Sequence, residues 1–377
     1  MVTNLLVLHI IARMNFGGTA KYLIALNNGL NNSGINSLIA SGSVQKGEID
    51  DPDVDQSSII RIKSMGRKIS FLADIKTGKE IKEIIANISP DIINTHTFKA
   101  GLLTRCQRNR IENSLGKKVK FVHTFHGHLF EDPEFRGFKS SIIKFIEKKL
   151  ARNTDQLITV GEKVKSDLIK YDIQGQYETK SIPPTVRPLK LATKNFALKK
   201  YNVKEKNRIR VLWMARVTGV KNPNRVIHIA RELPEVDFYI AGGGDLFDDL
   251  VKLAPKNLKV VGWQDPRKIL PLADIFLSTS ENEGMPIALI EAQLAKIPVV
   301  ATNVGSVSEV IIHNKTGFIC GKSNHELIIA IKKLAENKTL RIKFGQNARS
   351  YAIKNFSEKK FILAHKKLYK DLVKNYK

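Results

Sequence analysis

Short apolar runs alternate with longer stretches of helical periodicity through the first half of the chain. Buried parallel strands have continuous apolar runs of this kind, and amphipathic helices have apolar residues three and four positions apart. The runs that predict strands are residues 4–11, 35–40, 59–63, 91–95, 119–124 and 156–160. Helices are predicted over residues 20–31, 72–88, a stretch ending near 110, 137–152 and 162–171. This α/β alternation indicates a doubly wound parallel sheet, with ligands at the carboxyl ends of its strands.

A proline-rich stretch interrupts this pattern and separates the chain into two halves. Residues 181–188 contain three prolines, and polar, lysine-rich sequence follows as far as residue 207. Further strands are predicted over residues 209–214, 238–241, 258–263, 274–279, 298–302 and 318–320. We therefore predict a first domain over residues 1–186, a linker over 187–207, a second domain over 208–355 and a closing helix over 356–377.

The stretch from residue 278 to residue 296 contains the most specific arrangement of functional groups. An apolar strand leads into a polar turn with Gly284, and Pro286 suits the first turn of the next helix, where a missing N–H costs nothing. The free N–H groups at such a helix start bind anions. Glu283 lies just before this helix and Glu291 about two turns inside it. Because carboxylates accept hydrogen bonds from hydroxyls, the arrangement suits a ligand with both phosphates and hydroxyls, such as a nucleotide sugar.

Two cations follow the first strand of the second half. Arg216 and Lys221 are five residues apart and come after the carboxyl end of the predicted strand 209–214. Arginine presents a planar fork of donors and lysine a point charge, so the pair suits a diphosphate. The alternative is that they are two surface cations of a very basic protein.

Histidines and glycines gather at strand ends in the first half. The histidines are His96, His123, His126 and His128. A zinc site is disfavoured because no Cys, Asp or Glu completes a standard ligand spacing. The histidines are then either core and turn residues or contacts to a sugar. Gly17 and Gly18 let the backbone approach a phosphate, although a plain tight turn is the commoner explanation of such a pair.

Composition adds a compartment and a class of partner. The 377 residues include two cysteines, Cys106 and Cys320, without a disulfide or metal spacing, which predicts a reducing, cytoplasmic environment. No apolar run reaches the roughly 18 residues of a membrane span. The net charge of +26 indicates attraction to an anionic membrane or to nucleic acid, unless it reflects lysines on solvated helix faces.

Two charged segments have more than one interpretation. Residues 137–152 predict a basic amphipathic helix that either packs on the sheet with a solvated rim or contacts a membrane surface with anionic lipid. Residues 48–55 are acidic and contain Asp51-Pro52-Asp53, a triplet that can hold a metal. Because this triplet is far in sequence from the other candidates, we expect it to be a solvated loop.

These motifs together resemble one enzyme family over nearly the whole chain. The signature Glu-x7-Glu of retaining glycosyltransferases of family 4 resembles the stretch formed by Glu283, Gly284, Met285, Pro286, Ile287 and Glu291. Arg216 and Lys221 resemble the family's Arg-x4-Lys, which neutralises the leaving diphosphate. The resemblance implies the GT-B fold, with two facing Rossmann-like domains, a cleft between them and a final helix that crosses back onto the first domain.

The resemblance also implies roles for single residues. Glu283 and the backbone of residues 284–287 would orient the sugar, and Glu291 would accept from ribose hydroxyls. His126 would contact the sugar near the reacting carbon. The backbone at Gly262 and Trp263 would receive the base, and Gly17 and Gly18 would lie near the diphosphate and the acceptor.

The resulting expectation is transfer of a hexose or N-acetylhexosamine from a nucleoside diphosphate sugar, with retained configuration. Family frequency favours uridine as the base. The histidine motifs resemble those of polysaccharide assembly, which implies a glycan or undecaprenyl-type lipid-linked acceptor and work at the inner face of the membrane. No metal or other cofactor is needed if two cations and a helix start serve the diphosphate. Two alternatives remain: a sugar nucleotide epimerase of the same architecture, and a nucleic-acid-binding protein, although no nucleic-acid-binding signature is present.

Overall fold

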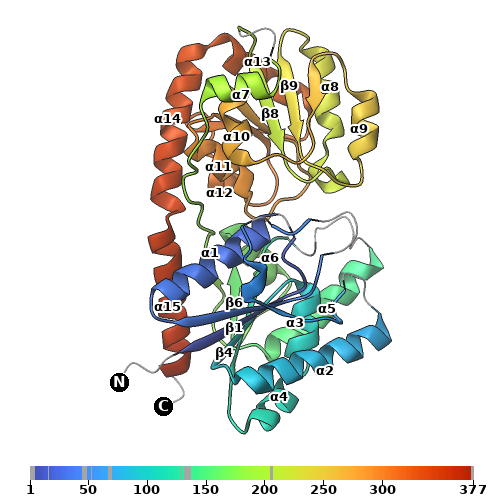
Figure 1. Cartoon of the computed structure of the whole chain (residues 1–377), viewed down its shortest axis with the longest axis vertical. Helices are drawn as coiled ribbons and strands as arrows, with labels where there is room; N and C mark the ends of the chain where they lie inside the picture. Colours follow the sequence, from blue (N-terminus) through green and yellow to red (C-terminus); the bar gives the residue numbers. More distant parts are fainter. Residues whose placement is uncertain are drawn as a thin grey trace. The chain divides into compact units, whose positions relative to one another are not determined.

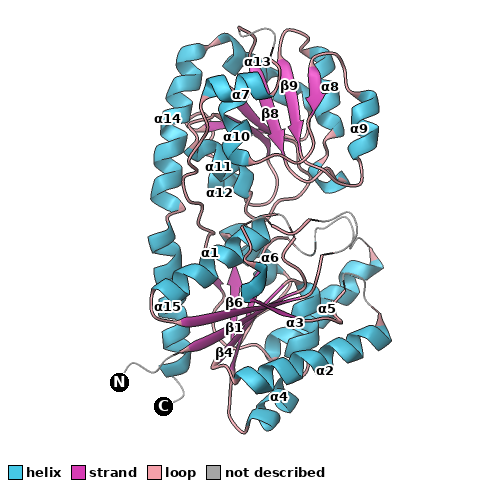
Figure 2. Ribbon diagram, in the orientation of Figure 1, coloured by secondary structure: helices cyan, strands magenta, loops and turns pink. Residues whose placement is uncertain are grey.

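The chain folds into two compact units. A computed structural model describes residues 5–15, 17–44, 49–51, 53–66, 70–128, 130, 137–203 and 207–374. One unit comprises Met1–Thr185 with Glu358–Lys377, and the other comprises Val186–Ser357. Each unit contains one parallel sheet with helices around it (Figures 1 and 2). The predicted α/β class with two parallel sheets is therefore confirmed.

The first unit is built on a seven-stranded sheet. Its strands are β1 (Leu6–Ile11), β2 (Asn36–Ser41), β3 (Ile59–Arg61), β4 (Ile92–His96), β5 (Lys120–Phe125), β6 (Gln156–Thr159) and β7 (Lys180–Ser181). They follow the order β3-β2-β1-β4-β5-β6-β7, with parallel pairing throughout. The order changes direction between β1 and β4, so the carboxyl ends of these two strands form the switch point at which open α/β sheets bind ligands.

The helices of the first unit match the predicted pattern except at one place. They are α1 (Gly18–Asn32), α2 (Phe71–Ile88), α3 (Phe98–Arg105), α4 (Arg108–Leu115), α5 (Phe138–Arg152), α6 (Glu162–Lys170) and α15 (Glu358–Lys374). The single helix predicted to end near residue 110 is wrong, because the chain turns between α3 and α4. At this turn the amide of Gln107 donates to the carbonyl oxygens of Leu103 and of Gly78 on α2.

The last helix, α15, belongs to the first unit and packs beside α1 (Figure 1). The hydroxyl of Tyr22 on α1 lies 2.9 Å from Nε2 of His365. The amide of Asn94 on β4 donates to the hydroxyl of Tyr369 at 2.8 Å. The predicted return of the closing helix to the first half is therefore confirmed.

The second unit is built on a six-stranded sheet. Its strands are β8 (Arg210–Met214), β9 (Asp237–Ala241), β10 (Leu258–Val260), β11 (Ile275–Ser278), β12 (Val299–Thr302) and β13 (Gly317–Cys320). They follow the order β10-β9-β8-β11-β12-β13, again with parallel pairing. Its switch point lies between β8 and β11, the strands that precede Arg216 and Glu283.

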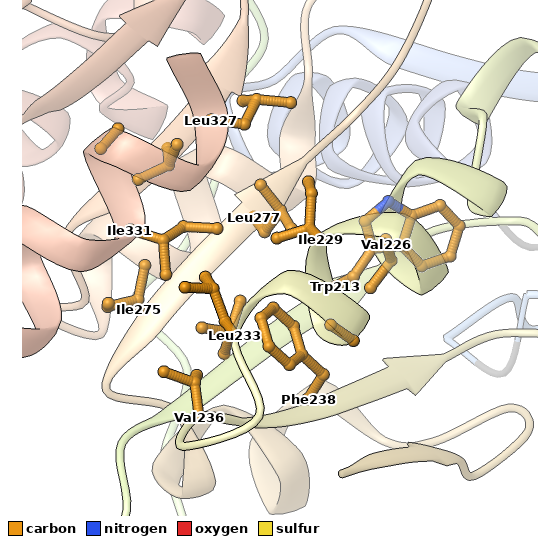
Figure 3. Close-up of a cluster of buried hydrophobic side chains, with 14 of the residues drawn as sticks. Trp213, Val226, Ile229, Leu233, Val236, Phe238, Ile275, Leu277, Leu327 and Ile331 are labelled. Atoms are coloured by element: carbon orange, nitrogen blue, oxygen red, sulfur yellow. The ribbon is translucent and has the colours of Figure 1, made fainter. Parts of the chain in front are cut away.

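Helices surround this second sheet, and their buried side chains form a core together with those of the strands. They are α7 (Lys194–Lys200), α8 (Asn224–Glu232), α9 (Phe247–Leu253), α10 (Pro266–Ile269), α11 (Ile287–Leu294), α12 (Val307–Val310), α13 (Asn324–Glu336) and α14 (Lys338–Asn355). Helix α7 lies within the stretch predicted as a linker. Figure 3 shows Ile229 of α8 and Ile331 of α13 meeting Leu277 of β11 in one buried cluster. Within the described residues, no helix has both the length and the apolar character needed to span a membrane.

Candidate active site

Two loops at the switch point of the second sheet are bonded to each other. The indole Nε1 of Trp213, on β8, donates to the hydroxyl of Thr279 at 3.0 Å. That hydroxyl lies 3.1 Å from the carbonyl oxygen of Lys221 and 2.8 Å from that of Asn222. The N–H of Glu281 donates to the carbonyl oxygen of Val220 at 2.8 Å. The loop after β11 therefore fixes the backbone of the loop that carries Lys221.

Lys221 and Glu283 form an ion pair within these loops. The ammonium of Lys221 lies 2.6 Å from Oε1 of Glu283, and the hydroxyl of Ser280 donates to the same oxygen at 2.6 Å. The two side chains are 20% and 11% exposed, so both groups reach the surface only in part. The predicted phosphate cation and the predicted sugar carboxylate therefore neutralise each other. A phosphate that bound Lys221 would leave Glu283 available to accept from hydroxyls.

Glu281 is a further charged member of the site that sequence reasoning missed. Its carboxylate accepts from the amide of Asn222 at 2.8 Å and forms ion pairs with Arg225 at 3.0 Å and Lys322 at 3.3 Å. Burial raises its pKa, but the hydrogen bonds and charges of these partners outweigh burial and hold the pKa below its usual value. Glu281 thus stays ionised and holds the two loops together. Its position between strand and helix was the only sequence signal.

Arg216 is an exposed cation of the site. Within the described residues its guanidinium has no hydrogen-bond or ion-pair partner, in contrast to the ammonium of Lys221. The backbone on either side of it rests against a glycine turn. A Cβ atom at Gly242 would lie 1.9 Å from the carbonyl oxygen of Ala215, and one at Gly244 would lie 2.5 Å from that of Val217. Both glycines also have positive φ angles, of 150° and 152°. Only glycine at positions 242 and 244 lets this turn approach the backbone on either side of Arg216, and the turn thereby positions the Arg216 loop.

Helix α11 (Ile287–Leu294) begins directly after Pro286, close to the predicted start. Ile287 is its first residue, and Pro286 with ψ of 92° precedes the helix instead of lying in its first turn. Among the residues that the structure describes, no side chain caps the helix start, so the first N–H groups of α11 are available to an anion. Gly284 and Met285 lie in the turn between Glu283 and the helix.

Glu291 lies inside α11, and Gly262 and Trp263 follow β10. Glu291 is 4% exposed and lines a small pocket with Leu189, Leu191, Leu294 and Ala295.

The strand predicted to reach residue 263 ends at Val260. Gly262 accepts from the N–H of Gly242 at 2.8 Å, and the Nε1 atom of Trp263 lies 2.4 Å from where a Cβ of Gly243 would be. Trp263 therefore packs on the glycine turn that supports Arg216.

The first unit holds the remaining candidates. Gly17 precedes α1 with φ of 156°, and Gly18 is the first residue of the helix. The acidic segment is a largely exposed loop, as predicted, except at Asp51, which is 1% exposed and accepts from the N–H of Asp53 at 3.1 Å. Burial raises the pKa of Asp51, although the N–H of Gly17 bonds to it and opposes the rise. The carboxylate thus occupies the same turn as the glycines. Glu48 and Pro52 of this segment lie outside the described residues.

The four predicted histidines separate into different environments. His96 and His126 are joined, with Nδ1 of His96 at 2.8 Å from Nε2 of His126. Nδ1 of His123 instead lies 2.7 Å from the hydroxyl of Thr95, and His128 bonds to the carboxylate of Asp167. Within the described part of the chain, no group of three or more His, Cys, Asp or Glu side chains is arranged to hold a metal ion.

Comparisons with known proteins extend over both units. A family model described as Glycosyltransferase Family 4 matches residues 16–183, and one described as Glycosyl transferases group 1 matches residues 194–351. The UDP-Gal:alpha-D-GlcNAc-diphosphoundecaprenol alpha-1,3-galactosyltransferase of Escherichia coli is 28% identical over 334 residues, 83% of this chain and 84% of that protein.

Solved structures share the fold over nearly the whole length. Sucrose-phosphate synthase from Thermosynechococcus elongatus superposes with a TM-score of 0.82 at 18% identity, over 98% of this chain and 99% of that one. Anabaena HepE in complex with UDP-glucose superposes with a TM-score of 0.78 at 17% identity, over 97% and 99%. At these identities the likeness demonstrates the fold, and the chemistry must be argued from the residues.

Proposed function

We propose, because this chain belongs to glycosyltransferase family 4 and has the GT-B fold, that it moves a hexose or N-acetylhexosamine from a UDP-sugar to a glycan or undecaprenyl-type lipid-linked acceptor. The observation that carries the proposal is the Lys221–Glu283 pair beside the uncapped start of α11 and the exposed Arg216. The relative from Escherichia coli, named for a UDP-galactose donor and an undecaprenol-linked acceptor, supports the choice of donor and acceptor.

The second unit would hold the donor. Arg216, Lys221 and the first N–H groups of α11 would bind the diphosphate, and this concentration of positive charge makes a metal ion unnecessary for binding. When Lys221 turns to the phosphate, Glu283 would accept from the sugar hydroxyls, together with the backbone from Gly284 to Ile287. Glu291 would accept from the ribose, and the backbone at Gly262 and Trp263 would receive the base.

The transfer step would then need mainly electrostatic stabilisation. The bond between the anomeric carbon and the phosphate oxygen breaks, and its electron pair leaves with the diphosphate. The acceptor hydroxyl oxygen bonds to the anomeric carbon on the same face, and its proton passes to the leaving phosphate, so configuration is retained. Arg216 and Lys221 would match the developing charge of the diphosphate. His126 would contact the sugar, and Gly17 with Gly18 would allow close approach of the acceptor.

Donor binding and product stereochemistry test this proposal. We expect calorimetry with uridine, guanosine and adenosine diphosphates to give selective binding of UDP, equally with magnesium or with a chelator. Incubation with a UDP-sugar and a lipid-linked acceptor should give a product whose anomeric configuration, read from proton NMR couplings, is that of the donor.

Other outcomes would redirect the assignment. An inverted product would contradict the retaining mechanism, and binding that requires magnesium would contradict the metal-free site. A new sugar nucleotide formed without any acceptor would identify an epimerase. No affinity for any of the three diphosphates would remove the proposed donor site.

The outer face of α5 is the surface through which we propose contact with an anionic membrane. Phe138, Ile142 and Phe145 are 82%, 43% and 59% exposed. Lysines flank them, and the ammonium of Lys149 lies 4.5 Å from the ring centre of Phe145. Exposed aromatic residues beside lysines are typical of helices that lie in the interface of anionic lipid. This contact would place the enzyme at the inner face of the cell membrane, where its lipid-linked acceptor lies.

Replacing Phe138 and Phe145 together by serine is expected to abolish most vesicle binding. The wild-type protein should sediment with vesicles rich in phosphatidylglycerol. This binding should weaken at high salt, because part of the attraction is electrostatic. The matched control is Ile329→Ser, which removes a residue of similar exposure, 51%, from α13. Equal binding of wild type and double variant, or equal binding to uncharged phosphatidylcholine, would contradict the proposal.

A further inference from the structure

Three histidine rings of the first unit form one hydrogen-bonded chain. His9 lies in β1, His96 ends β4 and His126 follows β5, and these three strands are neighbours in the sheet. Nδ1 of His9 lies 3.1 Å from Nε2 of His96, and Nδ1 of His96 lies 2.8 Å from Nε2 of His126. His9 and His96 are fully buried, whereas His126 is partly exposed. The buried rings of His9 and His96 are therefore linked by hydrogen bonds to the partly exposed ring of His126.

The two contacts allow only two arrangements of protons. Each contact between ring nitrogens needs one N–H and one lone pair, and a neutral imidazole has one of each. In the first arrangement all three rings carry the proton on Nδ1, and Nε2 of His9 is a lone pair. In the second all three carry it on Nε2, and His9 has a buried N–H at the end of the chain. The tautomer of His126 is thus linked to that of His9.

The surroundings of His9 favour the first arrangement. Nε2 of His9 is buried and has no hydrogen-bond partner in the part of the chain that the structure describes. Orphaned buried N–H groups are rare in proteins, and buried acceptors that lack a partner are somewhat less rare. The lone pair therefore belongs on Nε2 of His9, and the N–H of His126 belongs on Nδ1.

Burial keeps the chain neutral. Desolvation, followed by the charge of His365, lowers the pKa of His9 and of His126 to about 3. Desolvation, followed by His126 and His9, lowers the pKa of His96 well below its usual range. The titratable groups around these rings are Tyr22 on α1, His123 on β5 and His365 on α15. At neutral pH, His126 is therefore a hydrogen-bond donor and not an acid.

The C-terminal helix orients the exposed ring. Nδ1 of His365 lies 2.9 Å from the carbonyl oxygen of Phe361 and must donate to it, so Nε2 of His365 carries a lone pair. The hydroxyl of Tyr22 donates to that lone pair. The ring of Tyr22 then meets the ring of His126 edge-on, with centroids 4.7 Å apart and planes at 89°. Tyr22 and His365 thereby limit rotation of His126.

We propose that His9 and His96 are positioning residues that hold His126 as the neutral Nδ1–H tautomer, from which it donates to an oxygen atom of the sugar donor. This inference deepens the proposed function and rests on contact between His126 and the sugar. The chain does not relay protons, because Nε2 of His9 has no group within the described residues from which to take one.

NMR of the wild-type protein tests the tautomer without any variant. Long-range proton–nitrogen correlation spectra of protein labelled in histidine distinguish a protonated from an unprotonated ring nitrogen. We expect His126 to show a protonated Nδ1 and a bare Nε2, unchanged from pH 8 to pH 5. A proton on Nε2 of His126, or titration to the charged form within this range, would overturn the inference whichever donor the enzyme uses.

Two substitutions of His9 separate positioning from simple packing. His9→Phe removes the donor to His96 and is expected to mix the tautomers of His126 and to lower kcat/KM about threefold to tenfold, the ratio that one neutral hydrogen bond provides. His9→Asn, whose amide can donate from near the place of Nδ1, should keep the tautomer and most of the activity. Equal losses in both variants with an unchanged His126 tautomer would mean that His9 only fills space.

A substitution of His126 separates this inference from the proposed function. His126→Ala is expected to lower kcat/KM at least as much as His9→Phe, while UDP binding stays unchanged because the nucleotide contacts lie in the second unit. Full activity of His126→Ala would remove the sugar contact and with it this inference, even if UDP binding and transfer persist. If the wild-type protein does not bind UDP, the proposed donor is wrong, but NMR can still test the tautomer of His126.

Discussion

Replacing Lys221 by alanine is expected to lower kcat/KM about a hundredfold to a thousandfold. A preorganised donor aimed at the charge that develops in a transition state contributes roughly 3–4 kcal/mol. Lys221 fits this role because Thr279 fixes its backbone and Glu283 holds its ammonium 2.6 Å away before a phosphate arrives. Steady-state kinetics with a UDP-sugar and a lipid-linked acceptor would measure the loss.

The fold should survive this substitution. The Lys221–Glu283 pair joins two loops near the surface, and Ser280 still bonds to Glu283 when the lysine is removed, so we expect a change in Tm of only a few degrees. Lys252→Ala, which removes an exposed lysine from α9 in the same unit, is the control and should keep full activity. A fully active Lys221→Ala would refute the phosphate assignment, and a large fall in Tm would mean that the lysine is structural.

Replacing Glu147 by alanine is expected to destabilise the first unit by about 3–5 kcal/mol, because it leaves a buried cation without its partner. Nη2 of Arg105, on α3, lies 2.8 Å from both carboxylate oxygens of Glu147, on α5, and both side chains are 0% exposed. Burial outweighs the charge and hydrogen bonds of Arg105, so the pKa of Glu147 is raised above its usual value. Replacing both residues by methionine should recover most of the loss, since no charge then remains buried.

Urea unfolding followed by two probes would measure this effect. The two tryptophans of the chain, Trp213 and Trp263, both lie in the second unit, so their fluorescence reports on that unit alone. Circular dichroism reports on both units. We expect Glu147→Ala to shift the unfolding transition seen by circular dichroism to lower urea concentration. The midpoint of the fluorescence transition should not change. Glu178→Ala, which breaks an ion pair between exposed Glu178 and Lys165, is the control and should leave both transitions where they are in the wild type.

The histidine chain shows where sequence reasoning stopped short. His96 ends β4 and His126 follows β5, and these strands are neighbours in a parallel sheet, so their pairing could be predicted from the strand pattern. His9 lies inside an apolar run and His365 in the last helix, and neither position has a local signal. Their roles depend on the sheet order and on the packing of α15, which join residues more than eighty positions apart.

The second unit shows the same division. That Arg216 and Glu283 each follow a strand was readable from local sequence, and ligands collect at such strand ends. The ion pair between Lys221 and Glu283, and the glycine turn beneath Arg216, were not readable. They depend on which strands become neighbours at the switch point, and residue spacing along the chain does not contain that information.

The sequence by itself therefore determined most of the elements, the two parallel sheets and the loops that carry the candidate donor site. Hydrophobic periodicity and turn residues act over a few positions, and each βα loop follows directly from them. The tertiary structure alone decided which charges pair, which glycines cannot be replaced by a larger residue and which tautomer the buried histidines share. These properties arise where distant segments exclude water together, so that a polar group must find its partner in whatever segment packs against it.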